Sequence, residues 1–509
     1  MDPDVAKTLS DLEGKLLELE QTLGAIGRGE EPLQEHEEEP AQAPAATRES
    51  AGRLVDEAVE PELSPRTVPT QMPAAGAFAG GSLGGGTQTS VRATPPTPSG
   101  LQPPTAAELL RFRERLERTA RELTHDYDQL LGRLSFAAMP SPTAGPTAGG
   151  PTISFARGAP SLDIVDVEGL RDAALRAFES DPAGTTAYGT SVGYPRLRSW
   201  IADRHGVEPE RVLVTNGSMQ ADAFLFEHLV RPGDEVIVER PSYDRTLLSL
   251  RARGARLHDI ELEPDGIDID ALERLLGGGA GARPKLAHII PNFQNPAGYT
   301  LSLSKRRALL QLAAEHGFVV FEDDPYVELR FSGESLPTML SMDHDRVVYA
   351  SSFSKTVCPG IRVGYLVGPP DVIGAVAQLA TNTYISPNMV AQSIVYEFCV
   401  SGAIERSIET VKRALAQRAE TLASALAREL PEAEFVLPQG GYFMWVTLPP
   451  GTDVHALHHA AAERGVSFVK GTDFLLEGGE NTLRLAYAGV TPEQIETGVA
   501  RLAEAVRAL

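Results

Sequence analysis

The chain has 509 residues, of which 42% are hydrophobic, so it is long enough for a two-domain enzyme with appendages and too long for a small binding module. Its formal net charge of −23 disfavours non-specific binding to nucleic acid or to an anionic membrane surface. The two cysteines exclude a disulfide framework and are typical of a reducing cytosol. The sequence has no run of about 18 apolar residues and no signal-peptide pattern, so we expect a cytoplasmic protein that neither crosses a membrane nor binds nucleic acid.

The first 28 residues predict a short coiled-coil helix. Apolar side chains recur there at alternating spacings of four and three, which places them on one seam of a helix: Val5, Leu9, Leu12, Leu16, Leu19, Leu23 and Ile26. Residues 29–104 are acidic at first and then rich in Pro, Gly, Ala and Thr, so we expect a disordered linker that buries too little apolar surface to fold. Residues 1–60 hold 16 acidic and 5 basic side chains, so −11 of the −23 lies in this extension.

Residues 105–136 predict a second, amphipathic helix. Thr105 and Glu108 have the spacing of a capping box at its start. Its apolar stripe again has spacings of three and four: Leu109, Phe112, Leu116, Ala120, Leu123, Tyr127, Leu130 and Leu134. A Pro/Gly/Thr-rich linker follows at 137–151. Two interpretations stay open for both helices: they self-associate or pack onto the main domain, or they dock to a helix of another protein.

From Ile153 onward, apolar runs alternate with amphipathic segments of helical length. The runs that predict strands are 212–214, 235–238, 286–290, 319–321, 347–350 and 363–367. This alternation favours an α/β fold with a mostly parallel sheet covered by helices on both faces. After about Gly374 the pattern changes to long helices and two strands: 391–399, 403–430, a helix from Pro492, and the strands 443–448 and 483–487. We therefore expect a large domain at 152–374 and a smaller α+β domain at 375–509.

One lysine, Lys355, lies in a turn between two of these apolar runs. Since both runs predict strands, we expect Lys355 at the carboxyl-terminal edge of a buried strand, where open α/β sheets bind ligands. A lysine there can form a Schiff base with a carbonyl group, while Ser352, Ser354 and Arg362 can donate to a phosphate. This combination predicts pyridoxal 5'-phosphate as the cofactor. The alternative is a solvated loop lysine, which is what most lysines are.

The other groups that this cofactor requires follow successive predicted strands. A carboxylate must keep the ring nitrogen protonated, and Asp323 comes directly after a strand. Backbone N–H groups for the phosphate are expected near Ser218, where a helix follows a strand. Tyr243 is a candidate for stacking on the ring, and Asn295 and Tyr326 for donating to its phenolic oxygen. Each motif alone is also typical of a turn or a helix cap, but that interpretation does not explain why all follow strands.

From about Ile153 to Leu509 the chain resembles the fold-type I pyridoxal-phosphate enzymes of the class I and II aminotransferase family, in particular the aminoadipate, kynurenine and aromatic aminotransferases. Six motifs follow the family's order: Tyr188 to Arg198, Thr215 to Gln220, Asn295 to Gly298, Asp323 to Tyr326, Ser352 to Arg362, and Thr482 to Tyr487. The resemblance implies a seven-stranded, mostly parallel sheet and transamination between an amino acid and a 2-oxo acid. It also implies a homodimer, in which Tyr188 reaches the phosphate of the cofactor bound to the other subunit.

The resemblance further implies roles for individual residues. It implies that Lys355, Asp323 and Tyr243 are catalytic, with Lys355 forming the Schiff base. The implied cofactor-binding set is Tyr188, Ser218, Met219, Tyr243, Asn295, Asp323, Pro325, Tyr326, Ser352, Ser354, Lys355 and Arg362. Arg484 is implied to hold the α-carboxylate of the substrate, with Gly158 and Asn295 beside it. No metal site is implied.

Three residues depart from the family pattern. Met219 stands where the branch often has Gln, Ala297 where Thr is usual, and Lys470 where Pro is common. Lys470 is either a solvated surface lysine or a second amine near the substrate entrance that recognises an acidic or phosphorylated substrate.

Two other functions stay open. One is an enzyme of the same fold that directs the substrate carbanion to elimination, replacement, cyclisation or oxidation, because a fold does not fix a reaction. The other is an aminotransferase-like transcription regulator. The acidic residues 1–60 disfavour it, since a DNA-binding module is expected to be basic.

Overall fold

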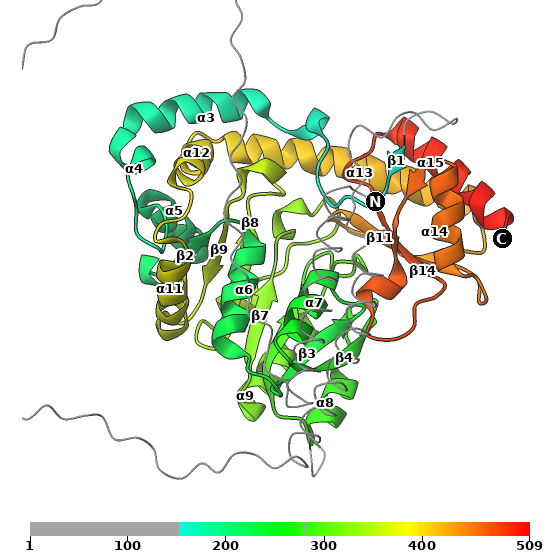
Figure 1. Cartoon of the computed structure of the whole chain (residues 1–509), viewed down its shortest axis with the longest axis horizontal. Helices are drawn as coiled ribbons and strands as arrows, with labels where there is room; N and C mark the ends of the chain where they lie inside the picture. Colours follow the sequence, from blue (N-terminus) through cyan, green and yellow to red (C-terminus); the bar gives the residue numbers. More distant parts are fainter. Residues whose placement is uncertain (1–151, 278–280) are drawn as a thin grey trace, which may run out of the picture. The chain divides into compact units, whose positions relative to one another are not determined.

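The computed structural model describes residues 152–277 and 281–509 (Figure 1). The coiled-coil helix, the linkers and the second amphipathic helix predicted within 1–151 lie outside the described residues. Within the described residues, no helix is both long and apolar enough to cross a membrane. That same part of the chain holds no group of three or more His, Cys, Asp or Glu side chains arranged to bind a metal ion.

The large domain is built on an eight-stranded sheet with the order β2-β9-β8-β7-β6-β3-β4-β5. In chain order the strands are β2 (Val212–Thr215), β3 (Glu235–Arg240), β4 (Arg256–Glu263), β5 (Gly266–Ile267), β6 (Pro284–Ile289), β7 (Val319–Asp323), β8 (Val347–Ser352) and β9 (Gly364–Val367). Neighbouring strands from β8 to β4 run parallel, whereas β9 is antiparallel to both β8 and β2. The predicted seven-stranded, mostly parallel α/β sheet is confirmed, with the two-residue β5 added at one edge.

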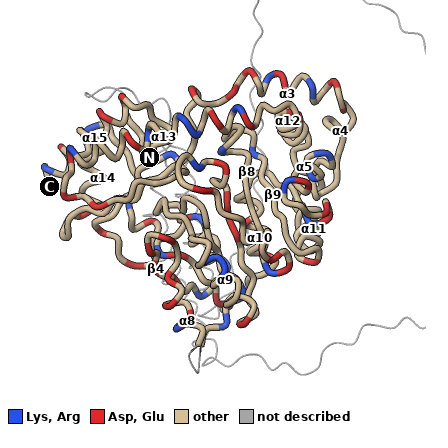
Figure 2. Tube along the Cα trace, turned by 180° about the vertical axis from the view of Figure 1, so that it is seen from behind, with Lys and Arg blue, Asp and Glu red and all other residues tan. Residues whose placement is uncertain are grey.

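Helices occupy most of the chain between the strands. In chain order they are α3 (Val167–Ser180), α4 (Pro182–Thr186), α5 (Pro195–His205), α6 (Ser218–Leu229), α7 (Asp244–Ala252), α8 (Ile269–Gly277), α9 (Leu303–His316), α10 (Met339–Met342), α11 (Pro370–Tyr384), α12 (Met389–Val400), α13 (Ala403–Glu429), α14 (Val454–Glu463) and α15 (Pro492–Arg507). Along α3, α13 and α15, basic and acidic residues are interspersed (Figure 2). These three helices therefore present no continuous basic face.

Both faces of the sheet are buried, because successive strand residues pack into different hydrophobic clusters. In β2, Val212 and Val214 pack with residues of α5, α9 and α12, whereas Leu213 packs with residues of α6, α7 and α11. Strand β8 shows the same alternation, with Val347 in the first cluster and Val348 in the second. Strands covered on both faces have continuous runs of apolar residues, and these runs are why the sequence predicts β2 and β8.

Strand β4 was not predicted, and its burial explains why. Only Ile260 of its eight residues is buried, and the strand contains polar and charged residues such as Asp259 and Glu261. It lies near the edge of the sheet, where only the short β5 follows it. A strand that is half exposed to solvent lacks the apolar run on which the other predictions depend.

The small domain contains a four-stranded antiparallel sheet with the order β10-β11-β14-β13. These strands are β10 (Glu434–Phe435), β11 (Phe443–Thr447), β13 (Val469–Lys470) and β14 (Thr482–Ala486). They share a hydrophobic core with α13, α14 and α15. Strand β1 (Ile153–Ser154) pairs in parallel with β12 (Val466–Ser467), and the neighbouring Phe155 is fully buried in the same core. The segment after β1 therefore starts in the small domain and continues to Gly158 at the site described below.

Candidate active site

Lys355 lies three residues beyond the end of β8, in the turn that the sequence analysis singled out. Its Nζ donates a hydrogen bond of 2.6 Å to the carbonyl oxygen of Gly158. Its own carbonyl oxygen accepts a hydrogen bond of 3.0 Å from the hydroxyl of Tyr442. The amine also lies 5.6 Å from the ring centre of Tyr326 and 5.1 Å from that of Tyr442. The lysine is thus held at both its backbone and its amine.

The pKa of Lys355 is low for a lysine. Burial is the largest cause, and the positive charges of Arg484 and Arg362 act in the same direction, so the pKa falls from 10.5 to about 8. The negative charge of Asp323 partly opposes this change. A larger fraction of the amine is therefore neutral near pH 7 than in an ordinary lysine, and the neutral amine is the nucleophilic form.

Asp323 ends β7, next to β8 in the sheet, and its side chain is almost completely buried. One carboxylate oxygen, Oδ2, lies 3.5 Å from Nε2 of His288. The other, Oδ1, is buried without a hydrogen-bond partner among the described residues. A buried carboxylate oxygen without a partner is costly, so a ligand that donates a proton to it would be bound favourably.

A cradle for an anion forms where the first turn of α6 meets the turn after Lys355. The N-cap residue Gly217 has a φ of +88°, and the cap has no side-chain hydrogen bond, so the first N–H groups of α6 are open to an anion. A Cβ at Gly217 would lie 2.1 Å from Nη2 of Arg362. Arg362 itself donates a hydrogen bond of 3.2 Å to Oγ of Ser354. Glycine at 217 therefore leaves room for the guanidinium beside the helix N-terminus.

Arg484 lies on β14 between two aromatic rings. Its guanidinium carbon is 4.3 Å from the ring centre of Phe443 and 4.8 Å from that of Phe474. Nη1 donates to Oδ1 of Asn295 and Nη2 to the carbonyl oxygen of Ala156, each at 2.9 Å. Burial lowers the pKa of Arg484. The buried Nε has no hydrogen-bond partner in the described structure, so the fixed guanidinium keeps donors for a further acceptor.

Comparisons with known proteins agree with this geometry. Residues 151–502 match the family model for aminotransferase class I and II. The chain is 37% identical to a 2-aminoadipate transaminase from Thermus thermophilus over 70% of this chain and 90% of that protein. It is 31% identical to an aromatic-amino-acid aminotransferase from Thermococcus litoralis, covering 70% of this chain and 88% of that protein. The chain belongs to the class I and II aminotransferase family.

A solved structure extends this comparison to the fold and the cofactor of the aminotransferase. An α-aminoadipate aminotransferase from Thermus thermophilus, complexed with N-(5'-phosphopyridoxyl)-L-leucine, superposes with a TM-score of 0.67 at 36% identity. The match covers 70% of this chain and 92% of that one. Pyridoxal phosphate is therefore the cofactor of this family member. The partnerless Oδ1 of Asp323, the open N-terminus of α6 and the amine of Lys355 fit its ring nitrogen, phosphate and aldehyde.

The aminotransferase brings most of the predicted site residues together. Tyr326 is buried against Tyr442 and Phe443, and burial raises its pKa well above the ordinary value. The hydroxyl of Tyr243 donates to Sδ of Met219 at 3.5 Å, across the start of α6. Three further predicted residues have these positions: Ser218 begins α6, Pro325 precedes Tyr326, and Oγ of Ser352 donates to the carbonyl oxygen of Val363 at 3.3 Å.

Two predicted residues lie apart from this cluster. Tyr188 is 89% exposed, so its place in the site depends on the predicted second subunit. Lys470 is only 3% exposed and pairs in register with Leu483, whereas Arg484 pairs with Val469. Because neighbours along a strand point to opposite faces, Lys470 lies on the face opposite Arg484. Its Nζ is 3.5 Å from Nδ1 of His455. The interpretation of Lys470 as a solvated surface lysine is therefore wrong, whereas its interpretation as a second amine near the substrate entrance stays a prediction.

Several residues of the site were not found from the sequence. Tyr442 and Phe443 follow the pair Gly440 and Gly441, where any Cβ would collide with Phe293. That glycine pair before a predicted strand was the one available signal of close backbone packing. Other residues that sequence reasoning missed are Phe474 beside Arg484, His288 beside Asp323, and Thr246 beside His288.

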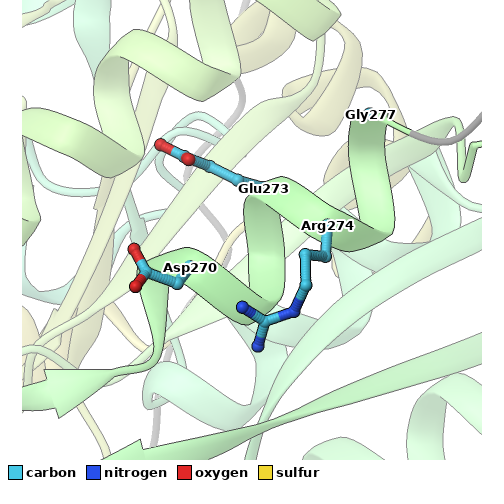
Figure 3. A pocket seen from close by; sticks show the side chains of 4 residues that line it. All are labelled: Asp270, Glu273, Arg274 and Gly277. Atoms are coloured by element: carbon cyan, nitrogen blue, oxygen red, sulfur yellow. The ribbon is translucent and has the colours of Figure 1, made fainter.

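A hollow on the surface of α8 has no connection with this site. Figure 3 shows the residues that line it, all from that one helix: Asp270, Glu273, Arg274 and Gly277. The three charged side chains point in different directions instead of converging on one position. We assign this hollow no role in the function.

Proposed function

We propose that the protein is a pyridoxal-phosphate-dependent aminotransferase that moves an amino group between an amino acid and a 2-oxo acid, with Lys355 as the residue that binds the cofactor covalently. The observation that carries this proposal is the pair formed by Lys355 and Asp323. Lys355 has a pKa lowered to about 8, and Asp323 at the same site has a buried carboxylate oxygen without a hydrogen-bond partner among the described residues. The family membership supplies the reaction class.

Bound pyridoxal phosphate supplies an aldehyde for covalent attachment and a ring that accepts the electron pair left on the amino acid when its α-proton is removed. The protein would hold this cofactor from three sides. Oδ1 of Asp323 would accept a hydrogen bond from the ring nitrogen, and the N-terminus of α6 with Arg362 would hold the phosphate. Tyr243, whose hydroxyl is tethered to Met219, lies beside the start of α6 as the candidate for stacking on the ring.

Lys355 would act twice in the reaction. Its neutral amine would hold the cofactor through the aldehyde until the substrate amine takes its place. The released Nζ would then take the proton from the α-carbon of the amino acid and, as an ammonium group, would return that proton to the carbon of the former aldehyde. Its pKa of about 8 lets the amine exchange a proton in both directions near neutral pH.

Arg484 would fix the α-carboxylate of the substrate. Its guanidinium is held by Asn295, by the carbonyl oxygen of Ala156 and by the rings of Phe443 and Phe474. A planar guanidinium matches a carboxylate with two parallel hydrogen bonds. Because the guanidinium is already oriented, little side-chain entropy is lost when the substrate binds.

Three finer statements belong to this proposal. The relatives' names support an acidic or aromatic amino acid as one substrate. We propose a homodimer, because the exposed Tyr188 needs a second subunit to reach a cofactor phosphate. We also propose a cytoplasmic location, which the two cysteines and the absence of a membrane-spanning helix in the described residues support.

The test is a panel of amino acids supplied to the purified protein loaded with pyridoxal phosphate. We expect 2-oxo acid formation with a matching amount of pyridoxamine phosphate when no acceptor is present, and turnover when a 2-oxo acid is added. Lys355→Ala should abolish this activity, whereas Lys412→Ala, on α13 and paired with Glu409, should not change it. Release of ammonia or of a cyclised product without pyridoxamine phosphate would instead show that the site performs elimination or cyclisation.

A further inference from the structure

A buried glutamine that the proposed mechanism does not use lies between two turns of the active site. Gln294 is 1% exposed and comes directly before Asn295, whose Oδ1 accepts a hydrogen bond from Nη1 of Arg484. The second turn begins at Pro241, two residues before Tyr243. The proposed mechanism uses a residue from each turn, and the side chain of Gln294 joins the two turns.

Hydrogen bonds fix the orientation of the Gln294 amide. Its Oε1 accepts a hydrogen bond of 2.8 Å from the backbone N–H of Ala297, and its Nε2 donates one of 2.9 Å to the carbonyl oxygen of Pro241. A backbone N–H can only donate and a carbonyl oxygen can only accept, so the amide cannot be reversed. Nε2 also donates to Oε2 of Glu239 on β3 at 3.1 Å. Glu239 is 2% exposed and accepts a second hydrogen bond from the backbone N–H of Ile290.

The two turns that Gln294 joins also hold Arg484. One turn supplies Oδ1 of Asn295, 2.9 Å from Nη1 of the guanidinium. The other supplies the backbone N–H of Ser242, which donates a hydrogen bond of 2.9 Å to the carbonyl oxygen of Phe474. The ring centre of Phe474 lies 4.8 Å from the guanidinium carbon. Gln294 therefore connects the acceptor and the ring that orient one guanidinium, while its own side chain bonds to other groups.

We infer that Gln294 is a positioning residue for Arg484. By joining the two turns, it keeps Asn295 and Phe474 where they orient the guanidinium toward the α-carboxylate of the substrate. Glu239 supports this arrangement as a buried acceptor for the amide. Gln294 acts through Arg484 and does not itself bind the substrate. The inference rests on the proposed function, because it requires Arg484 to bind that carboxylate.

The substitution Gln294→Glu separates positioning from packing. It keeps the shape of the side chain and the acceptor for Ala297, but it removes the N–H groups that reach Pro241 and Glu239. The measurement is made on protein loaded with pyridoxal phosphate. It is the ratio of kcat/KM for an amino acid to kcat/KM for the corresponding primary amine without the α-carboxylate. A general packing defect would slow both substrates and leave this ratio unchanged, whereas a displaced Arg484 would slow only the amino acid.

We expect Gln294→Glu to lower this ratio about tenfold. The matched control is Gln311→Glu on α9, because the amide of Gln311 also donates to a glutamate, Glu315, but on the surface. This control should stay within about twofold of the wild-type protein. In an Arg484→Lys background, Gln294→Glu should change the ratio by less than about twofold, because the guanidinium through which it acts is gone.

A second variant guards against a folding defect. Gln294→Asn keeps an amide that is one methylene too short to join the turns, and it should lower the ratio as Gln294→Glu does. An unchanged ratio in either folded variant would overturn the inference, and so would a further full loss in the Arg484→Lys background. If neither variant folds, Gln294 serves stability alone and the inference is also wrong. A wild-type protein that forms no pyridoxamine phosphate with any amino acid would instead overturn the proposed function, so the two failures are distinguishable.

Discussion

Replacing Arg484 by lysine tests how the site recognises a carboxylate. The guanidinium has five N–H donors, of which the structure uses one for Asn295 and one for the carbonyl oxygen of Ala156. A substrate carboxylate can take two of the remaining donors as a fork. Lysine keeps the positive charge but offers a single ammonium group in place of the fork, and it loses the flat contact with Phe443 and Phe474.

The loss can be worked out from the contacts. A hydrogen bond to a charged group contributes about 1.5–3 kcal/mol, so losing one of two costs about 1.5–3 kcal/mol. That corresponds to a fall of about 10- to 150-fold in kcat/KM for an amino acid. The assay is the half-reaction with the best amino acid of the panel, followed by the absorption of the bound cofactor at increasing substrate concentrations.

The control for Arg484→Lys is the primary amine that corresponds to this amino acid but lacks the α-carboxylate. We expect Arg484→Lys and the wild-type protein to react with this amine at rates within about threefold of each other, because the amine has no carboxylate to accept hydrogen bonds from the lost donors. Equal losses for both substrates would mean that the substitution damaged the site in general. An unchanged kcat/KM for the amino acid would refute the assignment of Arg484 to the carboxylate.

Three further outcomes follow from the geometry. The amine of Lys355 in the cofactor-free protein should react with an aldehyde at half its maximal rate near pH 8 and faster above that pH. The reason is that the fraction of neutral amine increases as the pH rises through the pKa of about 8. A midpoint of the rate-against-pH curve near 10.5 would contradict this prediction. Mixing inactive Tyr188→Ala and Lys355→Ala subunits should restore activity. In a mixed dimer, one site combines the intact Lys355 of one subunit with the intact Tyr188 of the other. If activity does not recover after the subunits have exchanged, the site is not shared between subunits. Gly217→Ala should weaken cofactor binding at least about tenfold, because its Cβ would lie 2.1 Å from Nη2 of Arg362, and unchanged affinity would contradict the proposed cradle.

The sequence predicted the parts of the site that local patterns encode. Lys355 and Ser218 follow strands that are buried on both faces, and Asp323 ends such a strand; these strands are visible in the sequence as apolar runs. Parallel strands place their carboxyl ends at one edge, so residues far apart in the sequence could be predicted to lie together. The half-exposed β4 gave no such run, and it was missed.

The parts that were missed depend on contacts between distant segments. Arg484 meets Asn295 across 189 positions, and only the resemblance to the family implied this pair, because no spacing rule relates the two. In the sequence, His288 is a single polar residue within an apolar run. Only the register of β6 with β7 shows that it lies beside Asp323. Lys470 was singled out because it stands where relatives commonly have Pro, and only the structure shows that it is buried and in register with Leu483.

The most direct test of the account is to find which lysine carries the cofactor. The purified protein is loaded with pyridoxal phosphate, the bond to the lysine is made permanent by borohydride reduction, and the modified peptide is identified by mass spectrometry. The account predicts one phosphopyridoxyl group per chain, attached to Lys355. Modification of Lys470, Lys412 or another lysine in its place, with Lys355 unmodified, would contradict the account.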